Sequence, residues 1–301
     1  MSGTPYEDPE DTKRLLEQIA FIRITHYGGF YDFTPDLAMA DTAYTNIALP
    51  AHTDTTYFSD PAGLQAFHLL SHKQDSKTDE VLSNEDASSD SAAGGKSLLV
   101  DGFHAARILL AEDPKAYEIL STVALPWHAS GNEGITIAPD QRYPVLELDK
   151  ETGELFRVRW NNDDRGVVPF GGKFTPTEWY EAARKWDSIL RRKDVECWIQ
   201  LEPGKPLGMS PPSRALHSAI MGLYCSPANT TEVFDNWRVL HGRSEFTGIR
   251  RICGGYSKCF PPPITRARCD LTCMLANRDD FISRWRNTNF PRTEILERII
   301  G

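Results

Sequence analysis

The strongest chemical signal in the sequence is a histidine followed two residues later by an aspartate, in His52-Thr53-Asp54. In an extended segment residues i and i+2 project to the same face, so one imidazole and one carboxylate can hold one metal ion. Of the eight histidines, His52 is the only one with an aspartate two positions later. The triplet alone is weak, because a surface histidine beside a turn aspartate gives the same pattern.

A second histidine, His241, lies in the run 234–243. Two histidines and one carboxylate on one face of an octahedron leave three positions open, the arrangement of Fe(II) oxygenases. Those positions suit a bidentate 2-oxo acid and dioxygen, and the far carboxylate of a 2-oxo acid then needs a cation. Only His241 has an arginine nine to thirteen residues downstream, namely Arg250 or Arg251. A guanidinium fork suits a carboxylate, and only one of two neighbouring strand residues can point inward.

Three stretches of the chain resemble the trimethyllysine and γ-butyrobetaine dioxygenases. They are Ala43-Tyr44-Thr45 to His52-Thr53-Asp54-Thr55-Thr56-Tyr57, Gly94-Gly95-Lys96-Ser97-Leu98-Leu99-Val100-Asp101-Gly102-Phe103, and Asn236-Trp237-Arg238-Val239-Leu240-His241-Gly242-Arg243. The resemblance covers roughly residues 15–207 and 233–256, and its motifs are specific. It implies hydroxylation of N6-trimethyllysine at C3, the first step of carnitine biosynthesis, with γ-butyrobetaine hydroxylation as the alternative.

The same resemblance implies a ligand set and cosubstrates. His52, Asp54 and His241 are the expected Fe(II) ligands. Arg250 is the expected anchor for 2-oxoglutarate, because Arg250-Arg251-Ile252-Cys253-Gly254-Gly255-Tyr256 matches the family segment with its arginine first. Ser97 is expected to touch the same carboxylate through its hydroxyl. Ascorbate, which keeps iron ferrous, is an expectation from the family and from no residue.

A quaternary ammonium group donates no hydrogen bonds, so a protein holds it by the faces of aromatic rings within about 6 Å. Tyr27, Tyr31, Tyr44 and Tyr256 fall where the family places its cage aromatics, and Tyr31 replaces what is often a tryptophan. Without the matched motifs, the same tyrosines are simply core or rim residues.

Asp41 distinguishes the two substrates of the family. A carboxylate at this position attracts the α-ammonium group of trimethyllysine and repels γ-butyrobetaine, which ends in a carboxylate; the butyrobetaine enzymes have asparagine here. Asn161 or Asn162 is expected to bind the substrate carboxylate, with Asn161 the better match. A plain turn-capping role for Asp41 is the alternative.

The element pattern favours a mostly β protein with helical buttresses, and the resemblance implies a double-stranded β-helix (jelly-roll). Period-two alternation predicts strands over Phe21–Thr25, Leu155–Trp160 and Val195–Leu201, and the apolar run Leu98–Val100 predicts a further strand of the core. Helices are predicted over 10–19, from about Phe103, after Asp113-Pro114, from the capping box at Thr175 to about Arg192, and from about Asp279 onward. Ser71 to Gly95 is polar and predicts a flexible loop.

The composition is that of an ordinary globular protein. A formal charge of −9 argues against a nucleic-acid partner. No apolar run is long enough to cross a bilayer, and the N-terminus lacks a signal-peptide core. Six cysteines without a CxxC pair favour a reducing compartment, so we expect a cytoplasmic or mitochondrial protein. A homodimer is compatible with the sequence, which does not decide the oligomeric state.

Two segments depart from the family pattern, at about 208–232 and 257–276, and we expect them to be insertions in a single catalytic domain. Both Gly208-Met209-Ser210 and Ser257-Lys258 can be encoded by codons that contain consensus 5′ splice sites, which suggests introns retained in frame; genuine surface insertions are the alternative. The family also carries an N-terminal domain before the matched region. Two further functional classes therefore stay open: an inactive product of a faulty gene model, and a sheet protein that binds quaternary amines without a metal.

Overall fold

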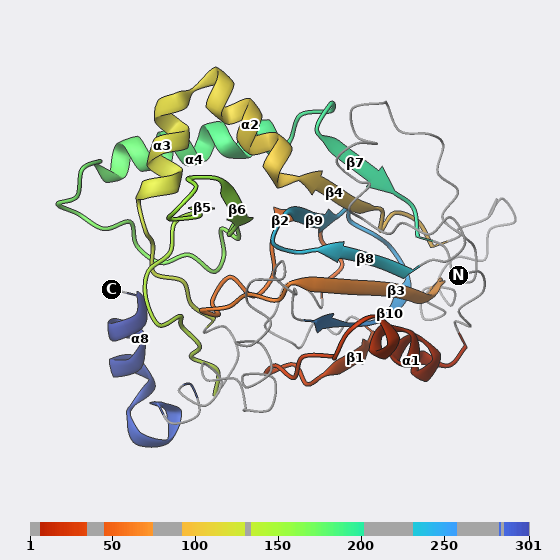
Figure 1. The fold of residues 1–301 in the computed structure, drawn as a ribbon. Helices are drawn as coiled ribbons and strands as arrows, with labels where there is room; N and C mark the ends of the chain where they lie inside the picture. Colours follow the sequence, from red (N-terminus) through yellow and green to blue (C-terminus); the bar gives the residue numbers. More distant parts are fainter. Residues whose placement is uncertain are drawn as a thin grey trace, which may run out of the picture.

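Two antiparallel sheets form the centre of the protein (Figure 1). The computed structural model describes residues 7–34, 45–74, 92–129, 134–201, 231–257 and 286–300, together with Ser283. The first sheet has the strand order β1-β10-β3-β8 and the second has the order β2-β9-β4-β7. A two-stranded sheet, β5-β6, lies beside them. This arrangement agrees with the predicted class, a mostly β protein with helical buttresses.

The strands of the two large sheets come from distant parts of the chain. The first sheet consists of β1 (Phe30–Phe33), β10 (Ile249–Ser257), β3 (Leu64–Lys73) and β8 (Thr231–Asp235). The second consists of β2 (Leu49–His52), β9 (Val239–Arg243), β4 (Ser97–Asp101) and β7 (Glu196–Ile199). The hairpin joins β5 (Leu146–Leu148) to β6 (Leu155–Val158). Every pairing between these strands is antiparallel.

Strand β4 shows how the second sheet is buried on both faces. Successive side chains of a strand point to opposite sides. Leu98 and Val100 pack into the large core beneath the helices, whereas Leu99 packs with Phe234 and Val239 between the two sheets. All five residues of β4 are buried, and so are all five of β9. The second sheet is therefore the middle layer of the molecule.

Three helices cover the outer face of the second sheet (Figure 1). They are α2 (Gly102–Glu112), α3 (Pro114–Thr122) and α4 (Pro176–Leu190). Asp113 caps α3 by accepting a hydrogen bond from the Ala116 amide, and Thr175 begins α4 with a complete capping box. On α4, the rings of Trp179 and Trp186 are fully buried against this core. These helix starts confirm the capping signals in the sequence.

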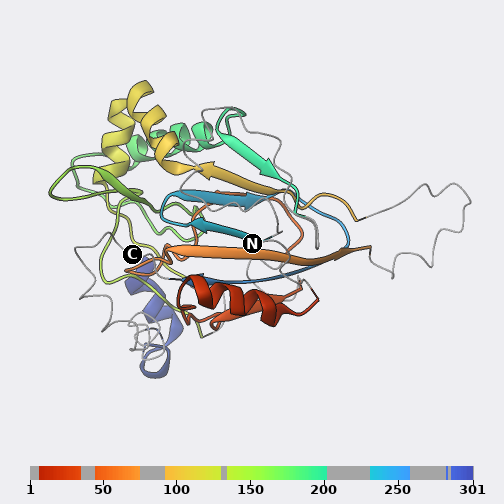
Figure 2. The same ribbon diagram turned by 45° about the vertical axis from the view of Figure 1, so that its right-hand side comes forward.

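Two helices lie elsewhere on the sandwich (Figure 2). Helix α1 (Pro9–Ile19) packs against β10 and β3 of the first sheet. Helix α8 (Arg292–Ile300) buries Ile295, and the side chain of Asn287 just before it donates to Thr136. Of the helices in the described part of the chain, none has both the length and the apolar character needed to cross a bilayer.

Two sequence predictions are wrong in the described residues. Residues 21–25 form no strand: Ile22 and Thr25 make only isolated bridges, and Phe21 is 81% exposed. The polar loop predicted from residue 71 begins later, because β3 continues through Lys73 in register with β10. Residues 231 and 232, at the end of the segment predicted as an insertion, pair with β3. Residues 75–91, 202–230 and 258–282 lie outside the described residues.

A buried histidine joins α1 to the first sheet. His68 on β3 is 1% exposed, and its Nδ1 lies 2.6 Å from the hydroxyl of Thr12 on α1. Burial lowers the pKa of His68 to about 4. The folded protein therefore keeps this imidazole neutral at a pH where the unfolded chain protonates it.

We predict that the free energy of unfolding falls as the pH drops from about 6.5 to about 4, and His68 is one cause. Between pH 6.5 and about 4, the unfolded state binds a proton at His68 and the folded state does not. The free energy of unfolding is therefore lower by about 2 kcal/mol at pH 5. Urea denaturation of the wild type and of His68→Gln at pH 7.5, 6 and 5 measures it. The two stability profiles should diverge below pH 6.5, and parallel profiles would contradict the prediction.

Candidate metal centre

Two histidines on adjacent strands meet an aspartate at the end of the second sheet. His52 ends β2 and is paired in register with His241 of β9, with ring centroids 4.4 Å apart. Asp54 follows His52, and its Oδ1 lies 3.3 Å from His52 Nε2 while its Oδ2 lies 3.7 Å from His241 Nε2. One donor atom from each residue lies within 4.8 Å of the other two. The structure thus brings together the three residues predicted as metal ligands.

The turn that carries Asp54 is tightly anchored. Thr53 is joined to Trp160 by two hydrogen bonds, from its own amide to the Trp160 carbonyl and from the Trp160 amide to its hydroxyl. Thr55 has a φ of 57°, an uncommon value for a β-branched residue, and its hydroxyl accepts a bond of 2.7 Å from the Ala62 amide. Backbone strain held by such contacts is typical of functional sites.

Asn236 fixes the backbone of Asp54 from the opposite side. This side chain is 1% exposed and precedes β9. Its Oδ1 accepts from the Asp54 amide at 2.8 Å, and its Nδ2 donates to the carbonyls of Asp54 and Ala62, both at 3.0 Å. One amide group therefore satisfies three buried backbone groups of the turn.

The carboxylate of Asp54 is held by neutral donors as well as by the histidines. Its Oδ2 accepts a hydrogen bond of 2.5 Å from Gln65 Nε2 and one of 2.8 Å from the Tyr256 hydroxyl. Burial alone would raise the pKa of Asp54. The imidazoles of His241 and His52, together with the hydroxyl of Tyr256, instead hold that pKa well below its ordinary value. Asp54 is consequently an anion, and its side chain is 21% exposed.

Both imidazoles are suited to bind a metal through Nε2. His52 Nδ1 donates to the Pro50 carbonyl at 2.8 Å. Burial lowers the pKa of His52, but the hydrogen bond and charge of Asp54 outweigh it and raise that pKa, so a cation at Nε2 would take the place of the proton that Asp54 favours there. Burial, followed by the nearby charge of His52, lowers the pKa of His241 to about 3, so its ring is neutral. Two neutral imidazoles and one carboxylate form the donor set that Fe(II) oxygenases use.

The two candidate arginines of β10 point in opposite directions. Arg250 is 3% exposed, and its guanidinium lies 5.7 Å from the ring centroid of Phe246. Arg251 faces outward and forms an ion pair with Asp32 of β1. A Cβ added to Gly95 would lie 3.5 Å from Arg250 Nε, so the glycine turn before β4 packs against this arginine. Arg250 is therefore the inward member of the pair.

A second buried arginine, Arg243, lies beside Arg250. It is 8% exposed and is paired in register with Ser97, and its guanidinium also stacks on Phe246, at 5.0 Å. Burial, followed by the charge of Arg250, lowers the pKa of Arg243 to about 10. Its Nη2 donates to the carbonyls of Thr45 and Ile47. Two guanidinium groups that repel each other make this pocket favourable for an anion.

Several tyrosines gather near Asp54. The rings of Tyr31 and Tyr256 have centroids 5.8 Å apart, inclined by 60°. Burial raises the pKa of Tyr256 well above its usual value, and the neighbouring Asp54, Tyr31, Tyr57 and Tyr27 raise it further. The structure thus brings together the predicted residues Tyr27, Tyr31 and Tyr256, and adds Tyr57.

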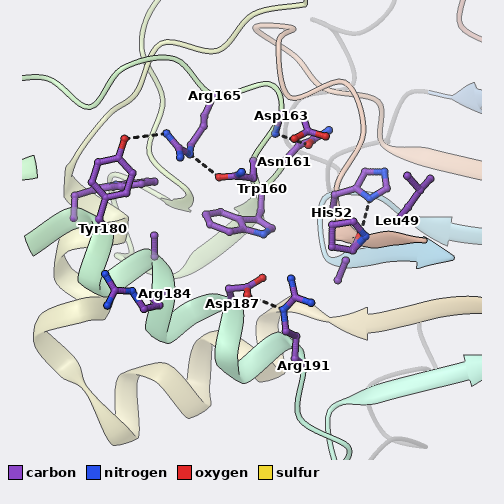
Figure 3. A pocket seen from close by; sticks show the side chains of 15 residues that line it. Leu49, His52, Trp160, Asn161, Asp163, Arg165, Tyr180, Arg184, Asp187 and Arg191 are labelled. Atoms are coloured by element: carbon purple, nitrogen blue, oxygen red, sulfur yellow. Dashed lines mark hydrogen bonds and ion pairs between the residues drawn. The ribbon is translucent and has the colours of Figure 1, made fainter. Parts of the chain in front are cut away.

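A recess of about 450 Å³ separates His52 from helix α4 (Figure 3). Trp160 and Asn161 line one wall, and Tyr180, Arg184 and other side chains of α4 line the opposite wall. The Oδ1 of Asn161 accepts a hydrogen bond from the Asp163 amide, whereas the Oδ1 of Asn162 accepts from Arg165. Both predicted asparagines line the recess, as His52 does.

Sequence reasoning missed four residues of the site: Gln65, Asn236, Arg243 and Tyr57. Asn236, Arg243 and Tyr57 lie within the matched motifs, which was a usable signal. Gln65 is a polar residue in the apolar run of β3, and only its burial reveals it. Asp41 and Tyr44, both predicted to bind substrate, lie outside the described residues.

Comparisons with known proteins agree with this geometry. The model of the taurine catabolism dioxygenase TauD, TfdA family matches residues 1–207. The chain is 63% identical to "Trimethyllysine dioxygenase" of Neurospora crassa, over 100% of this chain and 58% of the relative. It is 38% identical to "Trimethyllysine dioxygenase" of Meyerozyma guilliermondii, over 97% of this chain and 58% of the relative. It is 37% identical to the human "Trimethyllysine dioxygenase, mitochondrial", over 82% of this chain and 49% of the relative.

A solved structure shares the fold. The crystal structure of asparagine oxygenase superposes with a TM-score of 0.52 at 12% identity, covering 86% of this chain and 69% of that chain. This identity is too low to compare substrates. The chain spans 58% of the length of the two fungal relatives that it matches.

We predict that Asn236→Ala lowers the free energy of unfolding by about 2 kcal/mol, because the Asp54 amide and two carbonyls lose their buried partner. Urea denaturation measures the change. Asn162→Ala, at an exposed position, is the matched control and should change stability by less than about 0.5 kcal/mol. Equal stability of Asn236→Ala and the wild type would contradict the anchoring role.

Proposed function

Because the chain belongs to the TauD/TfdA family of dioxygenases, we propose that it carries the catalytic domain of an Fe(II)- and 2-oxoglutarate-dependent trimethyllysine dioxygenase. The observation that carries the proposal is the meeting of His52, Asp54 and His241 with their donor atoms turned toward one another. In this proposal the three side chains hold Fe(II). The names of the relatives suggest N6-trimethyllysine as substrate.

The spacing of the second sheet supports 2-oxoglutarate as cosubstrate. His241 and Arg243 are two residues apart on β9, so their side chains share a face at roughly 7 Å separation along the strand. A five-carbon 2-oxo diacid can therefore chelate the metal with one end while its far carboxylate meets Arg243 and Arg250. We propose Arg250 as the main anchor, with the hydroxyl of Ser97 beside it.

Bound Fe(II) would supply oxygen activation, coupled to conversion of 2-oxoglutarate into succinate and carbon dioxide, with one oxygen atom delivered to C3 of the substrate. The protein's own residues set the geometry. His52 and His241 offer neutral nitrogens, Asp54 offers a fixed anionic oxygen, and Arg250 orients the cosubstrate. The two sheets exclude bulk water from the space between them.

The tyrosines supply a site for a trimethylammonium group. We propose that Tyr27, Tyr31, Tyr44 and Tyr256 hold it by their ring faces, with the anion Asp54 adding a favourable potential. Asp41 would bind the α-ammonium group and Asn161 the carboxylate of trimethyllysine. Asn161 lines the recess beside His52, where an extended substrate could place its amino-acid end.

We further propose a single double-stranded β-helix domain that carries additions at about 208–232 and 257–276. Two observations support the first addition: the family match stops at residue 207, and strand pairing resumes at Thr231. Ascorbate as reductant, homodimerisation and a cytoplasmic or mitochondrial location belong to the same proposal. The human relative is named as a mitochondrial protein.

We predict that the chain, given Fe(II), 2-oxoglutarate, ascorbate and trimethyllysine, forms succinate and a hydroxylated product in equal amounts. His52→Ala should reduce turnover more than about 100-fold, since loss even of an outer partner of a metal ligand costs 10–100-fold. Mass spectrometry of both products measures it. His104→Ala, on the outer helix α2, is the control and should retain turnover.

The outcomes separate the open alternatives. Tight binding of trimethyllysine without metal and without succinate would favour a quaternary-amine binding protein. An aggregated or metal-free chain would favour the inactive product of a faulty gene model. Full turnover by His52→Ala would overturn the ligand assignment.

We predict that Asp41→Asn shifts substrate preference away from trimethyllysine. Removing one carboxylate next to an ammonium group should lower the ratio of kcat/KM for trimethyllysine to that for γ-butyrobetaine by about tenfold or more, which corresponds to about 1.4 kcal/mol. Competition between the two substrates in one reaction measures the ratio directly. An unchanged ratio would leave Asp41 as a turn-capping residue.

A further inference from the structure

The distal oxygen of Asp54 receives two hydrogen bonds from one cross-strand pair. Gln65 of β3 and Tyr256 of β10 stand directly opposite each other in the first sheet. Both donate to Asp54 Oδ2, at 2.5 Å and 2.8 Å. The sheet opposite the histidine strands thus reaches across to the aspartate.

These two donors leave one carboxylate oxygen for a metal. A carboxylate oxygen has two in-plane lone pairs, and two hydrogen bonds on Oδ2 occupy both. Oδ1, which lies 3.3 Å from His52 Nε2, remains available for coordination. A ligand held in this way binds through one oxygen and keeps neighbouring coordination positions open.

The burial of Gln65 indicates a role other than packing. The residue is 1% exposed, and among the described residues its Oε1 accepts no hydrogen bond. An amide oxygen buried without a partner costs about 1–3 kcal/mol, so an apolar side chain of similar shape would fill this space at lower cost. What the glutamine adds is the donor to Asp54.

We propose that Gln65 is a positioning residue that, together with Tyr256, holds Asp54 as a one-oxygen metal ligand. The inference rests on the proposed function only in requiring that His52, Asp54 and His241 bind a metal. Tyr256 then has two roles: its ring packs in the tyrosine cluster, and its hydroxyl holds the metal ligand Asp54 in place.

Metal affinity without any substrate tests the proposal. Mn(II) is titrated into the metal-free chain, and free Mn(II) is followed by electron paramagnetic resonance. Gln65→Met keeps the length of the side chain and removes the donor, so its dissociation constant should rise about 10–100-fold over the wild type. Gln18→Met, at an exposed position on α1, is the matched control and should bind Mn(II) as the wild type does.

A second variant separates the hydroxyl of Tyr256 from its ring. Tyr256→Phe keeps the aromatic face and loses the donor, so Mn(II) affinity should fall. In Gln65→Met/Tyr256→Phe the Mn(II) affinity should fall further than in either single variant. Visible absorption of the Co(II)-loaded variants should lose intensity as Asp54 becomes free to bind through both oxygens.

The Mn(II) affinities of the variants test the positioning role of Gln65 separately from the proposed function. Equal Mn(II) affinity of Gln65→Met and the wild type overturns the positioning role while the proposed function stands. Lower stability of the metal-free variant with unchanged affinity also overturns it, since that is the behaviour of a packing residue. Should Gln65→Met fail to fold, Tyr256→Phe decides: unchanged affinity overturns the proposal, and reduced affinity supports it. A wild type that binds no Mn(II), Co(II) or Fe(II) overturns the proposed function itself.

Discussion

The half-buried carboxylate of Asp54 is the group around which the site is arranged. An ionised carboxylate removed from water is strongly destabilising unless charges and hydrogen bonds replace its hydration. Here His52 and His241 approach from the second sheet, and Gln65 and Tyr256 from the first. The requirement to satisfy one anion therefore joins the two sheets, which also meet through the apolar cluster of Leu99, Phe234 and Val239. A divalent cation at the histidine side would complete the same arrangement.

Strand register makes this meeting possible. The pairs His52 with His241 and Gln65 with Tyr256 each join residues nearly two hundred positions apart. A slip of one residue in either pairing would turn these side chains to the opposite face. Gly242 helps to fix the first pairing, because a Cβ there would lie 2.5 Å from the Leu49 carbonyl of β2. The glycine between His241 and Arg243 is thus explained by the close approach of backbone.

What the sequence predicts well is local in origin. The capping signals of α3 and α4 and the spacing of His52 and Asp54 depend on neighbouring residues, and they agree with the structure. Residues 21–25 alternate as a strand does, but they make only isolated bridges. The alternation alone therefore predicted a strand that does not form. Alternation could not choose between Arg250 and Arg251; the choice depends on Asp32, which pairs with the outward one across β1 and β10. Gln65 could not be predicted from the sequence, because its role depends on a hydrogen bond to Asp54, which lies outside its own strand.

Tyr256 connects the tyrosine cluster to Asp54. Its ring packs at 5.8 Å from that of Tyr31, and its hydroxyl bonds to Asp54. A ligand that contacts the ring of Tyr256 would shift the side chain whose hydroxyl orients the carboxylate. A metal that binds Asp54 would, in the same way, shift the position of the ring. Linkage is reciprocal, so any change that substrate makes in metal affinity equals the change that metal makes in substrate affinity. A shared tyrosine is a short physical route for that coupling, since it needs no motion beyond one side chain and the carboxylate it holds.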